Sequence, residues 1–400
     1  MTSVFPDNLN DRNSIIKQKI LELCINGGDY SMADLARELG ISIPTITKLV
    51  GELIDGGWLE DLGKKGSSGG RRPSIYGLNS EAGYFAGVDL ERSHANVTVM
   101  DFKGRTVAWH ESVPFTFQNT EESCKELGDL IRNIFKKDEL DGGKLLSCGI
   151  DLSGRVNTAS GYSFTYFISE DKPLSSIIED CLGVPVAIDN DSRAMTYGEY
   201  LGGVVNGEKN ILFINASWGL GMGMILNGDL FYGNSGYSGE IGHFPMLDNN
   251  LICRCGKVGC LETGASGSAL LRIVTERLAQ GRSSILTEKY SKEKDISLED
   301  VLEAIREEDI VVIEAMEEVG MNLGRGIAGL INLLNPELVV IGGKLIVGGD
   351  YLMLPVRAAI RKHSLNMVSK DTTLKFSRLG HKAGSLGSSL LARSRFLGLM

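Results

Sequence analysis

Four side chains that can bind a metal lie close together in residues 240–262, EIGHFPMLDNNLICRCGKVGCLE. Cys253, Cys255 and Cys260 are separated by one and four residues, and His243 lies ten residues before the first of them. Zinc prefers thiolate and imidazole donors and binds four of them in a tetrahedron. Since the protein supplies all four, no position stays open for water. The loop therefore predicts a structural Zn²⁺ site, with three adjacent free thiols as the alternative.

A second group of residues that could bind a ligand is basic. Residues 62–79 contain four cations and no acid, namely Lys64, Lys65, Arg71 and Arg72. The whole chain has a formal net charge of −10, which argues against a protein that coats nucleic acid along its length. A local basic loop can still contact DNA. We expect Arg71 and Arg72 to contact phosphates or a minor groove.

The elements around this basic loop predict a winged helix-turn-helix in residues 1–80. Three short amphipathic helices are expected at residues 13–25, 31–40 and 42–57, and two strands near 58–62 and 74–78. Ser31 and Asp34 have the spacing of a capping box. The third helix is expected to begin with Ser42 as its cap and to bury Ile43, Ile46, Val50 and Leu53. The side chains expected to face a DNA major groove are Ser42, Thr45, Thr47 and Lys48. One alternative is a small helical domain with a solvated basic loop. Another is that the N-terminal helices mediate protein contacts only.

The bulk properties place the chain among cytoplasmic globular proteins. A length of 400 residues predicts two or three domains, and an apolar fraction of 42% is enough for their cores. No apolar run is long enough to cross a membrane, and residues 1–13 lack the pattern of a signal peptide. Seven cysteines, an odd number in this context, do not indicate a disulfide framework.

Residues 81–400 predict two α/β lobes with a cleft between them. From residue 84, three strands in a meander are followed by helices and strands in alternation, and the second half repeats that order. We expect the first lobe to contain residues 81–200 and 382–400, and the second residues 201–381. The last helix, expected at 385–396, would pack back on the first lobe.

The metal loop resembles a family signature. EIGH followed by CRCGKVGCLE is similar to the ROK family (repressors, open reading frames and kinases), in which the histidine and cysteines bind zinc. DND at 189–191 resembles its sugar-binding stretch, and NLLNPELVVIGG at 332–343 its adenosine-side motif. The N-terminal winged helix is similar to the family's branch of xylose and N-acetylglucosamine repressors. The resemblance implies an α/β body with the two-lobed actin-like ATPase fold of sugar kinases, Hsp70 and actin.

The resemblance also implies a sugar ligand. The residues expected to contact it are Gly154, Asn190, Asp191, Glu240, His243 and Glu262. Carboxylates suit this task because each can accept from two adjacent hydroxyls, and a ligand that lacks a hydroxyl leaves a buried acceptor unpaired. In the family's kinases the residue matching Asp191 is the general base. The alternatives are a helix N-cap for Asp191, and a salt bridge or surface loop for Glu240 and Glu262.

The two phosphate loops of such a kinase are altered here. The family's first loop is similar to Asp-x-Gly-Gly-Thr, whereas residues 89–93 read DLERS, so Glu91 would bring negative charge toward a nucleotide. In the second, Trp218 stands where a small hydroxyl residue is expected. The glycines that remain of a nucleotide site are Gly219, Gly221, Gly223, Gly342 and Gly343. We therefore expect Zn²⁺ as the cofactor and no productive use of ATP.

These patterns together predict a sugar-responsive transcriptional regulator, most simply a repressor, whose kinase-like body has become a sensor. Its expected partners are a double-stranded DNA operator and a monosaccharide or sugar-phosphate effector. A single winged helix makes few base contacts, so a homodimer or homotetramer is expected. The zinc loop would transmit the sugar signal, because His243 is both metal ligand and sugar contact. The alternative is an active ATP-dependent sugar kinase that carries a DNA-binding head.

Overall fold

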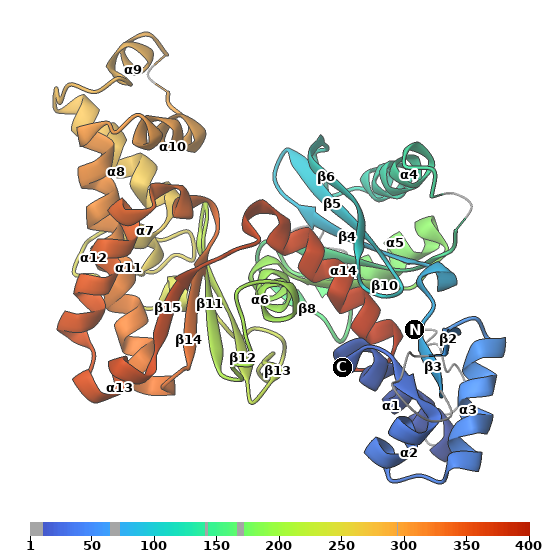
Figure 1. Ribbon diagram of the computed structural model, residues 1–400. Helices are drawn as coiled ribbons and strands as arrows, with labels where there is room; N and C mark the ends of the chain where they lie inside the picture. The colour runs from blue at the N-terminus through green and yellow to red at the C-terminus, as the bar shows by residue number, and fades with distance from the viewer. Residues whose placement is uncertain (1–10, 65–72, 141–142, 166–171, 294) are drawn as a thin grey trace. The chain divides into compact units, whose positions relative to one another are not determined.

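The computed structural model describes residues 11–64, 73–140, 143–165, 172–293 and 295–400 (Figure 1). The chain divides into two compact units, each described here by itself: Met1–Asp191 with Gly384–Met400, and Ser192–Ala383. The boundary falls after residue 191 rather than after residue 200, because the helix that follows it packs on the second sheet. Arg71 and Arg72 lie outside the described residues.

The head of the first unit, residues 11–78, has three helices and a small sheet. The helices are α1 (Arg12–Gly27), α2 (Met32–Leu39) and α3 (Ile43–Asp55). The strands β1 (Tyr30–Ser31), β2 (Leu59–Lys64) and β3 (Ser74–Leu78) pair in the order β1-β3-β2. This arrangement is a winged helix-turn-helix, in which β2 and β3 form the arms of the wing.

Two details of the third helix differ from the expectation. Ile46, Val50 and Leu53 are buried, but Ile43 is 52% exposed, because the first turn of α3 projects beyond the core of the head. Ser42 occupies the N-cap position of α3, yet its hydroxyl pairs with the Thr45 hydroxyl at 2.8 Å instead of with a backbone amide. The Ser31–Asp34 capping box at the start of α2 is confirmed.

The rest of the first unit is a five-stranded sheet in the order β10-β7-β4-β5-β6. Its strands are β4 (Tyr84–Leu90), β5 (His94–Asp101), β6 (Thr106–Pro114), β7 (Leu145–Leu152) and β10 (Val186–Asn190). Helices α4 (Glu121–Lys137) and α5 (Leu174–Leu182) bury their apolar faces on one side of the sheet. Helix α14 (Ala383–Phe396) lies on the other side (Figure 1), as expected for the last helix. A small hairpin, β8 (Val156–Asn157) and β9 (Tyr162–Ser163), and a 3-10 turn, η1 (Ser80–Ala82), complete it.

The second unit is built on the sheet β13-β12-β11-β14-β15. Its strands are β11 (Ile211–Ala216), β12 (Leu220–Leu226), β13 (Asp229–Leu230), β14 (Leu338–Gly342) and β15 (Thr373–Phe376). The helices that follow the metal loop are α7 (Glu262–Ala265), α8 (Gly267–Ala279), α9 (Thr287–Glu293), α10 (Leu298–Arg306), α11 (Ile310–Leu334), α12 (Asp350–His363) and α13 (Asn366–Asp371). The 3-10 turns are η2 (Ile241–His243), η3 (Lys344–Gly348) and η4 (Gly380–Lys382). Helices α8, α10, α11 and α12 share one core with the sheet.

Helix α6 (Asp191–Gly202) covers the opposite face of the second sheet. It approaches β12 so closely that a Cβ on Gly223 would lie 2.0 Å from the Thr196 hydroxyl oxygen. Both sheets follow one plan, since numbering the strands of each unit from its first large strand gives the order 3-2-1-4-5 twice. Among the described residues, no helix is long and apolar enough to cross a membrane.

Candidate functional site

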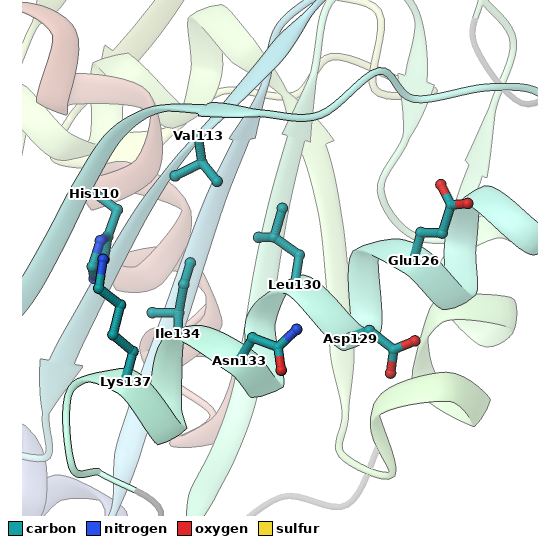
Figure 2. Close-up of a pocket in the computed structure, with 8 residues that line it drawn as sticks. All are labelled: His110, Val113, Glu126, Asp129, Leu130, Asn133, Ile134 and Lys137. Carbon is teal, nitrogen blue, oxygen red and sulfur yellow. The ribbon is translucent and has the colours of Figure 1, made fainter.

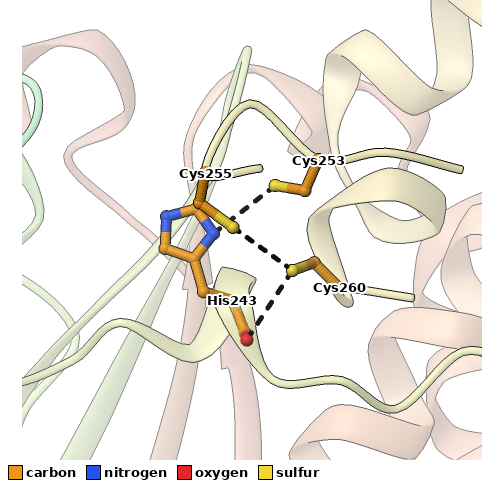
Figure 3. Close-up of side chains that lie close together, drawn as sticks. All are labelled: His243, Cys253, Cys255 and Cys260. Carbon is orange, nitrogen blue, oxygen red and sulfur yellow. Dashed lines mark hydrogen bonds between the residues drawn. The ribbon is translucent and has the colours of Figure 1, made fainter. Parts of the chain in front are cut away.

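The four predicted metal ligands meet in one cluster (Figure 3). Their donor atoms all lie within 4.8 Å of one another. The Sγ atoms of Cys255 and Cys260 are 3.6 Å apart, and His243 Nδ1 is 3.5 Å from Cys253 Sγ. Zinc–sulfur bonds of about 2.3 Å in a tetrahedron place two sulfurs about 3.8 Å apart. The cluster therefore has the donor set and the spacing that suit zinc.

A tight backbone turn brings the ligands together. The Cys253 amide donates to the Lys257 carbonyl at 2.7 Å, and Ile252 forms an antiparallel bridge with Val258. Gly259 has a φ of +75°, and a Cβ there would lie 2.6 Å from the Leu247 carbonyl oxygen. Only glycine fits such a position without strain. The glycine between the cysteines therefore allows the loop to fold back on itself.

The predicted sugar contacts of the second unit lie beside this cluster. His243 directs Nδ1 toward Cys253, while its Nε2 lies 3.6 Å from Oε2 of Glu240. Glu262 Oε2 accepts from the Leu220 amide at 3.1 Å, and its Oε1 lies 3.7 Å from Cys253 Sγ. The structure thus gathers Glu240, His243 and Glu262 around one edge of the metal loop.

The predicted sugar contacts of the first unit also meet each other. Asn190 Nδ2 donates to the Gly154 carbonyl at 3.0 Å and to Asp191 Oδ1 at 2.8 Å. The Ser153 hydroxyl donates to Asp191 Oδ2 at 2.9 Å. Gly154 has a φ of +92°, which opens the turn after β7 toward the end of β10. Both carboxylate oxygens of Asp191 are therefore held in a fixed orientation.

A pair of buried carboxyl groups lies behind these strand ends, and the sequence reading missed it. Asp89 is 4% exposed and Asp151 is fully buried, and Ser388 donates to Asp151 Oδ2 at 2.7 Å. Burial, together with the charge of Glu91, raises the pKa of Asp89 to about 6, and burial with the charge of Asp89 raises the pKa of Asp151 well above its ordinary value. Burial thus favours the protonated form of both carboxyl groups. The sequence feature that could have indicated this pair is a single acid, Asp151, inside the apolar strand LLSCGIDL.

The first altered phosphate loop is the turn between β4 and β5. The Glu91 amide donates to the His94 carbonyl at 3.0 Å, which closes the hairpin. The Glu91 carboxylate lies 3.3 Å from His94 Nε2 and close enough to Asp89 to raise its pKa. This turn presents a carboxylate, whereas a phosphate site presents amide donors.

The second altered loop is the turn between β11 and β12. Trp218 is 37% exposed at its tip, and the Ser217 hydroxyl donates to Asn215 Oδ1 at 2.7 Å. Gly343, with a φ of +85°, lies against this turn, since a Cβ there would lie 2.5 Å from the Ser217 hydroxyl. Of the predicted glycines, Gly219 is part of this turn and Gly343 lies against it.

The other three predicted glycines have packing roles. A Cβ on Gly221 would lie 2.2 Å from the Ser192 hydroxyl of α6, and Gly223 faces the same helix. A Cβ on Gly342 would lie 2.3 Å from the Phe213 ring. These close approaches give the three glycines a role in packing.

The predicted DNA-reading residues are on the outer face of α3. Ser42, Thr47 and Lys48 are exposed and Thr45 is half-buried. The Thr47 hydroxyl donates to the Ile43 carbonyl at 2.9 Å, so its methyl group is the part turned outward. The Lys48 side chain is 69% exposed and lies 3.9 Å from Glu52. The helix therefore offers hydroxyl, methyl and ammonium groups, which can contact base edges and phosphates.

A separate surface pocket of about 450 Å³ lies between β6 and α4 (Figure 2). Its lining residues are His110, Val113, Glu126, Asp129, Leu130, Asn133, Ile134 and Lys137. His110 Nε2 lies 2.6 Å from Asp138 Oδ2, so this polar group already has a partner. None of the predicted site residues lines the pocket, and we do not assign it to the candidate site.

Comparison with known proteins finds matches for both the head and the body of the chain. The ROK family model matches residues 85–395, and a winged helix-turn-helix DNA-binding model matches residues 14–60. The xylose repressor of Bacillus subtilis is 29% identical over 388 residues, which cover 96% of this chain and 97% of the repressor. A glucokinase of Halalkalibacterium halodurans is 32% identical over 255 residues, 63% of this chain and 77% of that enzyme.

A solved structure resembles the whole chain. It is a ROK family transcriptional regulator, a homolog of the E. coli MLC protein, with a TM-score of 0.83 at 27% identity, covering 97% of each chain. The resemblance therefore includes the head as well as the body. The chain belongs to the ROK family, and it joins the family's two-lobed sugar-kinase fold to an N-terminal winged helix-turn-helix DNA-binding head.

Proposed function

We propose that this protein is a DNA-binding transcriptional repressor whose ROK body responds to a sugar. The observation that carries the proposal is the end-to-end match with a xylose repressor, which includes both head and body in one chain. A family enzyme such as the matched glucokinase covers only 63% of this chain. The winged helix-turn-helix DNA-binding model matches residues 14–60 of this chain.

Each unit holds one group of the residues that we assign to sugar binding, at the strand ends of the first unit and at the metal loop of the second. Asn190 and Asp191 offer an amide and an oriented carboxylate, with the Gly154 backbone beside them. Glu240, His243 and Glu262 offer two further carboxylates and an imidazole nitrogen. Neighbouring hydroxyls of a monosaccharide or sugar phosphate match such acceptors, and a missing hydroxyl would leave a costly unpaired group.

A structural zinc ion would order the metal loop. His243, Cys253, Cys255 and Cys260 would hold it, and a closed four-ligand site gives no position for reactive water. Because His243 has Nδ1 on the cluster and Nε2 near Glu240, the ion would orient an imidazole at the sugar-binding edge. Metal ligation commonly orients a histidine in this way.

The body would bind sugar without phosphorylating it. The turn between β4 and β5 carries Glu91 beside the buried Asp89–Asp151 pair, so a nucleotide phosphate would meet negative charge there. A Cβ on Gly221, Gly223 or Gly342 would collide with a neighbouring side chain, so packing alone accounts for a glycine at each of these positions. Both features support a sensor.

On DNA, α3 would enter the major groove and the wing would contact the backbone. Ser42, Thr45, Thr47 and Lys48 would supply the base-facing contacts, and Arg71 and Arg72 the phosphate or minor-groove contacts. Few contacts per head favour two heads on two half-sites, hence a homodimer or a homotetramer.

The test is DNA binding with and without sugar. Duplexes are selected from a random-sequence pool by the full-length protein, and their affinity is measured by fluorescence anisotropy with D-xylose, D-glucose or N-acetyl-D-glucosamine added. We expect salt-dependent binding that Arg71→Ala with Arg72→Ala weakens, and a change of at least about fivefold with one sugar. Absence of DNA binding, or an affinity that no sugar or sugar phosphate changes, would contradict the proposal.

The second candidate is an active ATP-dependent sugar kinase with a DNA-binding head. It is favoured by the retained Asp191 and by the matched glucokinase. A coupled assay with ATP and the same sugars separates the two. Turnover that disappears in Asp191→Asn would establish the kinase and reject the pure sensor.

A further inference from the structure

We propose that helix α14 couples the sugar-binding strand ends of the first unit to the DNA-binding head, with Arg395 and Phe396 as its positioning residues. The inference rests on the proposed function, and it names the element that would carry the sugar signal to the head within one chain. Three sets of contacts support it: close packing on the sheet, polar bonds to the strand ends, and an aromatic contact with the head.

The packing of α14 on the sheet is unusually close. A Cβ on Gly87 would lie 2.0 Å from the Ser385 carbonyl oxygen, and a Cβ on Gly149 would lie 2.0 Å from that of Ser388. These glycines stand in the adjacent strands β4 and β7. With backbone against backbone, the helix has little freedom to shift independently of these strands.

Polar contacts also join α14 to β7 and to β10, near the residues proposed to bind sugar. Ser388 donates to Asp151 at the end of β7, and Arg395 Nη2 lies 2.7 Å from Asp189 Oδ2 on β10. The Asp189 side chain is 3% exposed and that of Arg395 is 13% exposed, so the ion pair is largely desolvated. Loss of one partner would leave the other charge buried, which is costly.

Asp189 also contacts the sugar-binding stretch directly. Its Oδ1 accepts from the backbone amide of Asn190 at 2.8 Å. Asn190 in turn bonds to Gly154 and Asp191 through its side chain. A ligand that repositions Asn190 therefore acts on the residue that holds Arg395.

The C-terminal end of α14, where Arg395 lies, also meets the head. The Phe396 ring lies 6.1 Å from Trp58 of the head and 5.6 Å from Phe85 of β4, and Trp58 lies 5.3 Å from Phe102. Arg393 donates to the Phe102 carbonyl at 3.1 Å. Gln18 of α1 donates to the carbonyl of Gly398, just beyond the helix. The head thus rests on an aromatic cluster to which α14 contributes.

These contacts make α14 a connection between two sites. A change at the end of β10 alters the Arg395–Asp189 pair, and a shift of α14 alters the support of Trp58 in the head. Packed interfaces respond to small shifts by switching between discrete arrangements, and energetic coupling passes through such contacts. The head would then change its orientation or mobility when sugar binds.

The test measures the coupling itself in the full-length protein. The ratio of the DNA dissociation constants with and without the sugar that acts on the wild type is determined for Arg395→Met and Trp58→Leu. Arg132→Met, which removes an exposed arginine of the first unit, is the matched control. Linkage requires that DNA change the affinity for sugar by the same factor, which provides a second reading.

We expect a ratio of at least about fivefold in the wild type and the control, and less than about twofold in both test variants. Sugar affinity without DNA should remain in Trp58→Leu, and thermal unfolding shows that each variant is folded. If Arg395→Met does not fold, Arg395→Lys, which keeps the charge but alters the fork geometry, replaces it, with a reduced ratio expected.

The outcomes separate this inference from the proposed function. A wild-type response that persists unchanged in folded variants at Arg395 and Trp58 would overturn the role of α14 and leave the repressor intact. A wild type that binds DNA but responds to no sugar would overturn both. Loss of the ratio in the control as well would show that any change in the first unit abolishes coupling, and would overturn the specific role of α14.

Discussion

The two units share a strand order and differ at the corresponding hairpin turn. In the first unit the turn between β4 and β5 carries Glu91, next to the buried acids Asp89 and Asp151. In the second, the turn between β11 and β12 contains Ser217, Trp218 and Gly219 and no acid. The same 3-2-1-4-5 sheet thus supports an acidic strand end in one unit and an uncharged one in the other. The strand plan sets positions, and the side chains at the strand ends decide the chemistry.

The additions to the two units differ as well. Within the described residues, the second unit holds the cysteine and histidine cluster, whereas the first holds the winged helix and the helix that supports it. We infer that a bound metal would order residues of the second unit, and that DNA would contact the first unit. This separation can be tested by changes that affect one unit only.

The largest expected effect comes from removal of the proposed zinc ion. Chelation with EDTA, or Cys260→Ser, should expose the metal loop and lower stability by several kcal/mol, because Ile252 and Val258 at its tip are 76% and 50% exposed and contribute little apolar burial to hold the tip. Hydrogen exchange should rise in residues 240–262 and remain unchanged in the first unit. Equal exchange increases in both units would contradict the separation. Added Zn²⁺ should restore protection.

The next effect concerns the acids of the first unit. The folded pKa of Asp89, about 6, is above its ordinary value of 3.8, so the folded state binds more protons between these pH values. Stability should therefore fall as pH rises from about 4 through 6, by about 3 kcal/mol for this group. Asp89→Asn removes this titration. Urea unfolding at pH 5 and 7.5 should show a smaller loss in the variant, and parallel losses would refute the assignment.

Two glycine-to-alanine substitutions, one in each unit, should change stability in opposite directions. Gly149→Ala places a methyl group 2.0 Å from the Ser388 carbonyl oxygen and should cost about 1–3 kcal/mol by overpacking. Gly329→Ala lies in α11, where the nearest atom to the new Cβ is Met246 Cε at 3.9 Å, and should stabilise by up to about 1 kcal/mol. Thermal unfolding of both variants checks the signs. A stabilising Gly149→Ala would show that α14 does not pack closely on β7.

The smallest effect is expected at the surface contact between head and body. Lys103 Nζ lies 2.9 Å from Glu60 Oε1 at a partly exposed position. Lys103→Met should change stability by less than about 1 kcal/mol, since exposed ion pairs contribute little. Trp58→Leu should cost more, because it removes a ring from the aromatic cluster. If Lys103→Met were less stable than Trp58→Leu in urea unfolding, the ion pair would contribute more than the aromatic cluster to the contact between head and body.

Local patterns in the sequence were sufficient for much of the fold. The capping box at Ser31, the buried Ile46, Val50 and Leu53, and the strands of the wing depend on neighbours within a few residues. The prediction for Ile43 was wrong, because periodicity does not show where the core of the head ends. The roles of Gly221 and Gly223 were also hidden, since their partner α6 is defined only by tertiary packing.

The sequence by itself determined the family, the domain order and the metal donor set, because these depend on residue types at short, fixed spacings. The cluster of His243, Cys253, Cys255 and Cys260 lies within 18 positions, and a short loop can bring them together in few ways. Tertiary structure alone decided that Asp89 and Asp151 share a buried environment, and that Ser388 and Arg395 reach Asp151 and Asp189 from 237 and 206 residues away. No local periodicity encodes such contacts; they arise where a sheet and a distant helix bury a common surface.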